Sequence, residues 1–291
     1  MFEGVLPALV TPFSKDNSID SENFCNIVSF VEEGGVSGIV ACGTTGESAT
    51  LSMDEHKELI AIAMDCASVP VVAGTGSNNT AEAVELTKHA ADVGTDGALV
   101  ISPYYNKSNT AGLLAHFKTI AEAADIPIIL YNVPSRTGQD LSVEVIAELA
   151  RVDNIVAVKE ASGSVEKVSC ILEMTADEDF IVLSGEDSLT FPIVALGGSG
   201  VVSVIANVVP DMMVKLVEST KKGDLQTARE MHFKMAPLIR ALFSETNPIP
   251  VKRAMEHMGL VEGNLRLPLA PLSKENDTIL KDALRGLGCI S

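Results

Sequence analysis

Residues 126–160 read IPIILYNVPSRTGQDLSVEVIAELARVDNIVAVKE. Two continuous apolar runs, IPIILYN (126–132) and IVAVKE (155–160), flank a segment at 142–151 whose apolar residues recur at helical spacing. Continuous apolar runs of this length are typical of parallel strands that are buried on both faces. The stretch therefore predicts a strand–helix–strand unit with two parallel strands.

The same unit recurs along the chain. Six further apolar runs, rich in Val, Ile and Leu, occur at 4–11, 37–43, 69–74, 97–102, 180–185 and 200–206. Strands that alternate with helices form either an open doubly wound sheet or a closed barrel. The regular spacing and the total of eight runs favour the (β/α)8 TIM barrel, an α/β fold.

Helical patterns fill the intervals between the runs. Ser52 and Glu55 have the spacing of a capping box ahead of an apolar stripe. Further helical segments are predicted at 83–93, 110–124, 142–151, 164–175, 187–196 and 211–222. After residue 222 the strand signal stops, and the pattern predicts three more helices at about 224–243, 249–258 and 275–287. We therefore expect a catalytic barrel at 1–223 and a small helical C-terminal extension at 224–291.

The charge of the chain limits its partners. It has 291 residues, of which 46% are hydrophobic and 21% charged, as in globular proteins. Its net charge of −18 disfavours binding to nucleic acid and to anionic membranes. No stretch reaches about 18 uninterrupted apolar residues, so no membrane span is predicted. If the substrate is an anion, a few specific cations must supply the local attraction.

The cysteines and the N-terminus predict a cytoplasmic protein. The N-terminal stretch MFEGVLPALVTPF lacks a basic region and is interpreted as a first strand, not a signal peptide. The five cysteines are odd in number and have no metal or redox spacing, which is typical of free thiols in a reducing compartment. They are Cys25, Cys42, Cys66, Cys170 and Cys289.

Lysine and tyrosine residues follow the predicted strands at their carboxyl ends, where TIM barrels carry their active sites. Lys159 closes the run that begins at Ile155, and Tyr131 closes the preceding run. An amine in the barrel mouth can attack a carbonyl group and form an imine. The alternative is a solvated lysine that pairs with Glu160. The other two tyrosines, Tyr104 and Tyr105, also follow a strand, which favours the catalytic interpretation.

Two glycine-rich turns have different expected roles. The turn GTTG (43–46) follows a strand, so its backbone N–H groups and threonine hydroxyls form a candidate nest for a carboxylate. The turn GGSG (197–200) precedes the eighth strand and is expected on the opposite face as a tight turn. No nucleotide-binding glycine motif is present, and the five histidines have no paired spacing. The sequence therefore predicts no cofactor and no metal.

Several motifs together resemble the dihydrodipicolinate synthase family over essentially the whole chain. The stretch YNVPSRTG (131–138) is similar to these synthases in particular, whereas related pyruvate aldolases share the glycine–threonine turn, the tyrosine and the lysine. The other matching stretches are GTTGESATLS (43–52), AGTGSN (73–78), SPYYNK (102–107), VKEASG (158–163), LSGED (183–187), GGSGVVSV (197–204) and NPIPVK (247–252).

The resemblance implies a class I lyase of lysine and diaminopimelate biosynthesis. Such an enzyme condenses pyruvate with L-aspartate 4-semialdehyde and gives 4-hydroxy-tetrahydrodipicolinate. By resemblance, Lys159 forms the Schiff base, Tyr131 donates and accepts protons, and Thr44 and Tyr105 complete a hydroxyl relay. The implied substrate contacts are Thr45, Gly185 and the backbone at Val202 for pyruvate, with Arg136 for the carboxylate of the second substrate.

Elementary chemistry agrees with these roles and leaves two alternatives. A phenol alone is a poor base, so Tyr131 needs a chain of hydroxyls that passes the proton to water. Arg136 supplies the permanent cation that a chain of charge −18 needs for anionic substrates. An aldolase for 2-keto-3-deoxy sugar acids or N-acetylneuraminate would share Lys159 and Tyr131, but it would not need the arginine. A non-catalytic barrel would be expected to have lost Lys159 or Tyr131.

The resemblance also implies an assembly and an effector. Members of the family form homotetramers of two tight dimers, in which the Tyr105 equivalent serves a neighbouring site. Many members are inhibited by L-lysine at the tight-dimer interface. The matching positions here are Ser48, Ala49, His56, Asn78, Glu82 and Tyr104. Met53 stands where lysine-sensitive members commonly have a histidine, so we expect inhibition to be weak.

Overall fold

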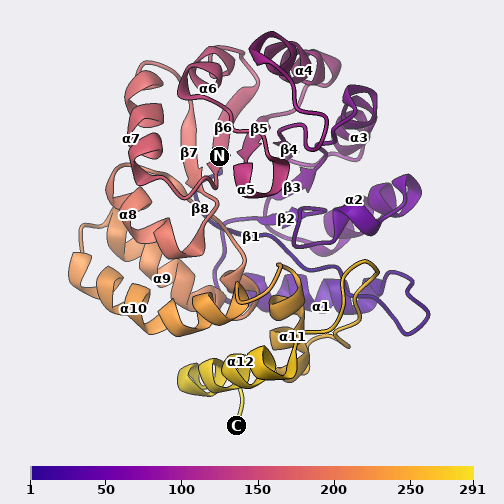
Figure 1. Cartoon of the computed structure of the whole chain (residues 1–291), viewed down its shortest axis with the longest axis vertical. Coiled ribbons are helices and arrows are strands. Elements are labelled where there is room, and N and C mark those ends of the chain that lie inside the picture. The colour runs from indigo at the N-terminus through magenta and orange to yellow at the C-terminus, as the bar shows by residue number, and fades with distance from the viewer. Residues whose placement is uncertain (1) are drawn as a thin grey trace.

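The eight predicted strands form one parallel sheet that curves into a barrel (Figure 1). The computed structural model describes residues 2–291. Every predicted run contains a strand, so the TIM-barrel prediction is confirmed. The strands are β1 (Gly4–Pro7), β2 (Ile39–Ala41), β3 (Val71–Gly74), β4 (Gly97–Ile101), β5 (Ile128–Asn132), β6 (Ile155–Glu160), β7 (Ile181–Ser184) and β8 (Gly200–Ser203).

The barrel closes between β1 and β2. The strands pair in the order β1-β8-β7-β6-β5-β4-β3-β2, and each pair is parallel. A parallel bridge between Ala8 and Val40 joins the two ends of this order. The backbone N–H of Leu9 donates to the carbonyl oxygen of Val40 at 2.9 Å, and that of Ser37 donates to Val5 at the same distance. Hydrogen bonds therefore continue around the whole barrel.

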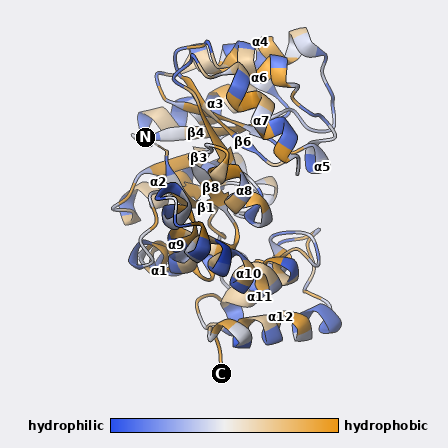
Figure 2. Cartoon of the chain, turned by 90° about the vertical axis from the view of Figure 1, so that its left-hand side faces the viewer, coloured by the Kyte–Doolittle hydropathy of each residue, from blue (hydrophilic) through white to orange (hydrophobic). Residues whose placement is uncertain are grey.

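Helices surround the barrel, with their apolar faces toward the strands and their polar faces outward (Figure 2). The capping box predicted at Ser52 and Glu55 is present at the start of α2. The barrel helices are α1 (Ser21–Glu33), α2 (Met53–Cys66), α3 (Thr80–Asp92), α4 (Thr110–Ala123), α5 (Pro134–Thr137), α6 (Val143–Leu149), α7 (Val165–Met174), α8 (Thr190–Ala195) and α9 (Pro210–Lys221), with the 3-10 helices η1 (Ser48–Thr50), η2 (Asp187–Leu189) and η3 (Ile205–Asn207).

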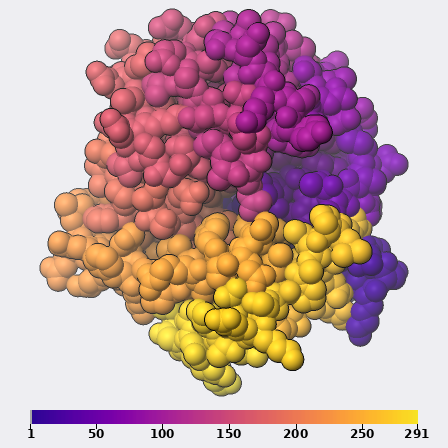
Figure 3. Space-filling view, viewed as in Figure 1, coloured from indigo at the N-terminus to yellow at the C-terminus, as the bar shows by residue number. Residues whose placement is uncertain are grey.

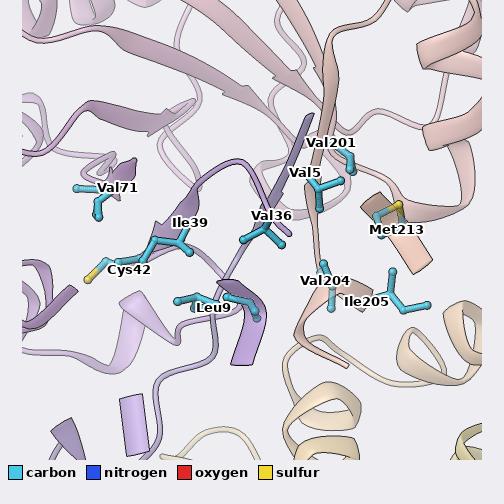
Figure 4. Packing of buried hydrophobic residues seen from close by; sticks show 14 of the residues in the cluster. Val5, Leu9, Val36, Ile39, Cys42, Val71, Val201, Val204, Ile205 and Met213 are labelled. Atoms are coloured by element: carbon cyan, nitrogen blue, oxygen red, sulfur yellow. The ribbon is translucent and has the colours of Figure 1, made fainter. Parts of the chain in front are cut away.

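Alternate residues of each strand belong to two apolar clusters. The larger cluster lies between strands and helices, and Figure 4 shows part of it around Val5, Ile39 and Val201. The smaller cluster fills the barrel interior and includes Tyr131, Leu183 and Val202. Because successive strand residues point to opposite faces, this alternation decides which side chains reach the interior.

Three helices follow the barrel, as predicted. They are α10 (Leu225–Leu242), α11 (Ile249–His257) and α12 (Lys274–Leu287). Figure 3 shows these C-terminal residues, orange to yellow, packed along one side of the barrel and reaching the indigo N-terminal segment. The segment between α11 and α12 is fastened to the barrel by Arg266, whose guanidinium binds the carboxylate of Glu55 in α2. This extension therefore covers part of the barrel mouth.

One cysteine prediction is wrong. Cys25 in α1 and Cys66 in α2 form a disulfide, with their Cα atoms 5.2 Å apart. The two residues are 41 positions apart, and the packing of neighbouring helices brings them together. Cys42, Cys170 and Cys289 are free, of which Cys42 is buried. Burial raises the pKa of the Cys42 thiol.

Two local features differ from the helices that the sequence predicts. The segment predicted as a helix at 187–196 divides into η2 and α8. The short helix α5 follows β5, where no helix was predicted. In residues 2–291, no helix is both long enough and apolar enough to span a bilayer.

Candidate active site

Lys159 and Tyr131 lie side by side at the carboxyl ends of β6 and β5. The register of the two strands pairs these residues directly. The Nζ atom of Lys159 lies 4.0 Å from the centre of the Tyr131 ring. Lys159 is 6% exposed and Tyr131 is 7% exposed, so the amine is enclosed by the barrel and not solvated. The structure therefore favours the interior lysine over the surface lysine that would pair with Glu160.

Glu160 has other partners. Its carboxylate accepts hydrogen bonds from the side-chain amide of Asn132 at 2.9 Å and from the backbone N–H of Ser162 at 2.6 Å. Asn132 in turn donates to Asp140 at 2.8 Å. Because Glu160 alternates with Lys159 along β6, its side chain is on the helix-facing side of the strand. It anchors the loops that follow β5 and β6.

Gly185 leaves room beside the candidate nucleophile. A Cβ atom at this position would lie 3.2 Å from Cε of Lys159 and 2.6 Å from Cβ of Ala161. Any larger residue would therefore displace the Lys159 side chain or the loop after β6. Val202 lies one strand further, in β8, where its side chain is part of the interior cluster. Tyr131 therefore lies on one side of Lys159 along the barrel wall, and Gly185 and Val202 lie on the other side.

The turn that follows β2 is held in place by side chains from distant parts of the chain. The hydroxyl of Thr11 donates to the carbonyl oxygen of Gly46 at 2.6 Å. The side-chain amide of Asn247 donates to Oγ1 of Thr45 at 3.0 Å. Glu47 has a left-handed backbone, with φ of 55°, and its carboxylate binds the ammonium of Lys252. The turn is therefore fixed from both sides.

A cavity of about 540 Å³ opens from this turn. Thr44, Tyr131 and Arg136 line this cavity, so the structure brings together three of the predicted catalytic and substrate-binding residues. Lys159, Thr45, Gly185 and Val202 are not among its lining residues. Arg136 belongs to α5, is largely exposed, and donates from Nη2 to the carbonyl oxygen of Asn247 at 3.0 Å. A guanidinium at the cavity wall can bind a carboxylate.

Two carboxylates after β7 were not singled out in the sequence. Asp187 is 2% exposed and accepts hydrogen bonds from the hydroxyl of Ser203 and from two backbone N–H groups after β8. Burial raises the pKa of Asp187, while these hydrogen bonds oppose the shift. Burial also raises the pKa of Glu186, with the negative charge of Asp187 adding to it and Lys159 and Arg136 opposing it. Asp187 thereby fixes the loop that follows β8, two residues after Val202.

The glycine-rich turn at 197–200 lies at the opposite end of the barrel, as predicted. It precedes β8, and the carbonyl oxygen of Ser199 accepts a hydrogen bond from Gly4 at 2.9 Å. A Cβ atom at Gly200 would clash with the backbone of Gly4. The glycine is therefore needed for the close approach of β1 and β8.

Comparison with known proteins supports the family suggested by the motifs. The family model described as "Dihydrodipicolinate synthetase family" matches residues 1–287. The chain belongs to this family. Two relatives named 4-hydroxy-tetrahydrodipicolinate synthase come from Methanosarcina mazei and Methanosarcina acetivorans. They are 67% and 68% identical to the chain, and each alignment covers 99% of both sequences.

Solved structures of the synthase family have the same fold. Dihydrodipicolinate synthase from Aquifex aeolicus matches with a TM-score of 0.97 and 46% identity, over 99% of each chain. The synthase from Acinetobacter baumannii, 42% identical with a TM-score of 0.97 over all of both chains, is complexed with pyruvate. That from Cyanidioschyzon merolae, 40% identical with a TM-score of 0.96 over 99% of each chain, has lysine bound. The similarity shows the fold and the family.

Tyr105 does not join the cavity within one synthase chain. Its side chain is 92% exposed, and its backbone is left-handed, with φ of 71°. A non-glycine residue rarely adopts this conformation without a functional reason. Tyr104, by contrast, is 37% exposed and lines the cavity. Of the predicted hydroxyl relay, the single chain brings together Thr44 and Tyr131 but leaves Tyr105 outside.

Five of the six positions matching the lysine site of the synthases line the same cavity, and we call this set of walls the outer cavity. Its walls include Ser48, Ala49, His56, Glu82 and Tyr104, as well as Met53. Asn78 contributes its carbonyl oxygen to a hydrogen bond with Asn106 at 2.9 Å.

Two side chains at these positions already have partners. Nε2 of His56 lies 2.7 Å from the carbonyl oxygen of Gly74, and burial lowers the pKa of this histidine. The imidazole is therefore neutral and donates from Nε2. The carboxylate of Glu82 accepts hydrogen bonds from Ser77 at 2.8 Å and from Asn79 at 3.0 Å.

Proposed function

We propose that this chain condenses pyruvate with L-aspartate 4-semialdehyde through a Schiff base on Lys159, which gives 4-hydroxy-tetrahydrodipicolinate. The chain is a class I pyruvate-dependent lyase of the synthase family. The observation that supports the assignment of the nucleophile is the position of the Lys159 amine, enclosed in the barrel and 4.0 Å from the Tyr131 ring centre.

The proposed reaction has four steps at this amine. Nζ of Lys159 attacks the ketone carbon of pyruvate, and loss of water gives the imine. Loss of a proton from the methyl group then gives an enamine, whose carbon attacks the aldehyde of the second substrate and restores the imine. The amino group of the second substrate then attacks the imine carbon, which closes the ring and releases the Lys159 amine. Tyr131 is adjacent to the amine and moves the protons, and the Thr44 hydroxyl in the same cavity extends the path.

We assign the two substrate carboxylates to different walls. Thr45, Gly185 and the Val202 backbone hold pyruvate beside Lys159. Arg136, on the cavity wall, holds the carboxylate of the second substrate. The position of Arg136 favours an anionic second substrate over the hydroxylated tail of a sugar acid.

Substrate competition tests this assignment. Wild-type enzyme with pyruvate should turn over L-aspartate 4-semialdehyde far faster than the aldehydes from which 2-keto-3-deoxy sugar acids or N-acetylneuraminate are built. Arg136→Ala should raise the KM for the semialdehyde more than that for pyruvate. Because Arg136 is largely exposed, we expect a loss of about 2 kcal/mol, the lower end for a charged contact. A change in the KM for pyruvate alone would show that Arg136 binds pyruvate, and it would contradict this assignment.

We also propose a homotetramer in which Tyr105 completes a neighbouring site, and L-lysine as an effector in the outer cavity. The exposure and backbone conformation of Tyr105 support the first proposal. The cavity walls around Glu82 and His56 support the second, while the thioether of Met53 favours weak binding. A related dihydrodipicolinate synthase, 40% identical, is a monomeric variant, so the assembly needs its own measurement.

The effector proposal is tested by titration. L-lysine should inhibit the wild type partially, up to tens of millimolar, with a coupling of about 1–3 kcal/mol. Glu82→Ala should lose this response because Glu82 can bind the lysine ammonium, whereas Glu47, the other carboxylate in the cavity wall, is paired with Lys252. A flat response in wild type, or equal inhibition of both enzymes, would remove the proposed effector site.

Two further assignments stay predictions. The division at residue 223 follows the end of α9, but α10 packs against that helix, so we expect the extension not to fold alone. The sequence predicts a cytoplasmic location partly because it predicts free thiols, and the Cys25–Cys66 disulfide removes that part of the support.

A further inference from the structure

Asn247 connects three parts of the candidate active site. It lies in the C-terminal extension just before α11 and is 6% exposed. Its side-chain Nδ2 donates to Oγ1 of Thr45 at 3.0 Å, across 202 positions of sequence. Its carbonyl oxygen accepts from Nη2 of Arg136 at 3.0 Å. Asn247 also lines the cavity, so one residue touches both proposed carboxylate-binding groups and the cavity wall that includes Arg136.

The direction of the hydrogen bond to Thr45 has a chemical consequence. A threonine hydroxyl has one proton to donate and two lone pairs that accept. Because Asn247 is the donor, Oγ1 of Thr45 accepts, and its proton remains available for another acceptor. A pyruvate carboxylate offers only acceptors at neutral pH. The hydroxyl proton is therefore free for the group that Thr45 is proposed to bind.

The opposite orientation of the amide is less favourable. In the observed orientation, Oδ1 of Asn247 is buried without a hydrogen-bond partner among residues 2–291. If the side-chain amide were rotated by 180°, Oδ1 would accept a hydrogen bond from Thr45. The buried NH2 group would then have no hydrogen-bond acceptor. Buried N–H groups without partners are rarer than buried carbonyl oxygens without partners. The energetics of the amide therefore favour donation to Thr45.

A buried ion pair holds the same segment against the turn. Lys252, in the first turns of α11, binds Glu47 at 2.5 Å, and both side chains are at most 1% exposed. The Lys252 ammonium also lies 4.1 Å from the centre of the Phe13 ring. Glu47 is two residues after Thr45, and Lys252 is five residues after Asn247. The pair therefore fixes the register in which Asn247 meets Thr45.

We propose that Asn247 is a positioning residue that sets the hydrogen-bond direction of Thr45, so that the Thr45 hydroxyl donates to the carboxylate of pyruvate. This inference rests on the proposed function, because it takes Thr45 as a pyruvate contact. It gives the C-terminal extension a part in substrate binding that acts through Thr45. It also explains why Arg136 and Thr45, which are assigned to different substrates, share one neighbour.

Two substitutions at Asn247 separate positioning from packing, because aspartate keeps the shape of this buried side chain and alanine does not. Asn247→Asp keeps the shape but has no donor, so its carboxylate takes the Thr45 proton that pyruvate needs. Asn247→Ala removes the donor and leaves Thr45 free to rotate. We expect the KM for pyruvate to rise about fivefold for the alanine variant and more than tenfold for the aspartate variant, with kcat less changed. A role in packing alone predicts the reverse order, and that result would overturn the proposal.

A double-mutant cycle tests whether Asn247 acts on the KM for pyruvate through the Thr45 hydroxyl. In a Thr45→Val background, Asn247→Ala should change the KM for pyruvate by less than about twofold, because there is no hydroxyl left to orient. Full additivity of the two effects would overturn the proposal. Thr45→Ser is the matched control, since it keeps the hydroxyl and should retain the sensitivity to Asn247. Thermal melts of every variant report whether the fold is intact.

The outcome distinguishes this inference from the function on which it rests. Wild-type enzyme is treated with pyruvate and borohydride in parallel, and an adduct on Lys159 supports the proposed function independently of Asn247. With that adduct present, an unchanged KM in both Asn247 variants overturns the positioning role alone. Absence of the adduct in wild type overturns the proposed function itself.

Discussion

The ring of Tyr131 lies against the amine of Lys159, and no other described tyrosine reaches this position, since Tyr104 and Tyr105 are on the outer surface. This geometry predicts an order of effects among three variants. Tyr131→Phe should reduce kcat more than Thr44→Val or Tyr105→Phe, because the proposed mechanism assigns the proton transfers to the Tyr131 hydroxyl. We expect a loss of at least about 100-fold, the usual size of a general acid–base contribution.

Tyr131→Phe, Thr44→Val and Tyr105→Phe should all remain folded, because each removes a hydroxyl and keeps the ring or a side chain of similar volume. Circular dichroism and thermal melts provide that control. Steady-state rates at saturating substrates provide the comparison. Wild-type turnover in Tyr131→Phe would contradict the proton-transfer role.

At the residue scale, local patterns predicted part of the site. Lys159 and Tyr131 close two consecutive apolar runs, so their adjacency follows from strand alternation and the parallel order. Asn247 and Lys252 were not predicted, although both belong to the motif NPIPVK (247–252). Their partners are about 200 positions away, and no local pattern encodes such a contact. The sequence offers one indication of the buried ion pair, which is that Lys252 follows three apolar residues at the start of α11.

Among the elements, the contact between α11 and the turn after β2 depends on the Glu47–Lys252 pair. Lys252→Met leaves a buried, unpaired carboxylate, and Glu47→Gln leaves a buried, unpaired ammonium. Breaking a fully buried pair from one side typically costs about 3–5 kcal/mol. We expect each single variant to lose this much free energy of unfolding. The double variant should recover most of the loss because no buried charge remains unpaired.

Urea denaturation of the four proteins measures this effect. A single variant within about 1 kcal/mol of wild type would show that water reaches the pair and compensates for the missing partner. Lys222→Met is a suitable control, because its ion pair with Glu218 is exposed and should contribute little.

The elements themselves were largely predictable, and their exceptions have physical causes. Eight apolar runs predicted eight strands, since strands buried on both faces are mostly apolar and carry polar residues here mainly at their carboxyl ends. The short helix α5 was not predicted because four residues carry no periodicity. The disulfide between α1 and α2 was not predicted because a spacing of 41 residues has no meaning until the two helices are packed together.

For the whole molecule, the exposed Tyr105 predicts that activity needs a second copy of the chain. Subunit complementation gives a direct test. Lys159→Ala and Tyr105→Phe subunits should each have low activity alone. In a mixed dimer, the site that keeps Lys159 would receive a wild-type Tyr105 from its neighbour, so mixing should restore activity. Mass photometry should show a tetramer, with a dimer as the smallest active species.

Two results would contradict this assembly. A fully active monomer would show that Tyr105 is not needed from a neighbour. No gain on mixing, with mixed oligomers present, would show that Tyr105 serves its own chain. A mixture of wild type and Lys159→Ala controls for the effect of subunit exchange alone.

The central claim is that Lys159 is the nucleophile, and borohydride trapping tests it most directly. The enzyme is incubated with pyruvate and sodium borohydride, digested, and its modified peptide is identified by mass spectrometry. We predict one reduced pyruvate adduct on Lys159 in the wild type. Lys159→Ala and Lys159→Arg should show no adduct, since neither side chain forms an imine. An adduct on another lysine, or an undiminished adduct in the Lys159 variants, would contradict the account.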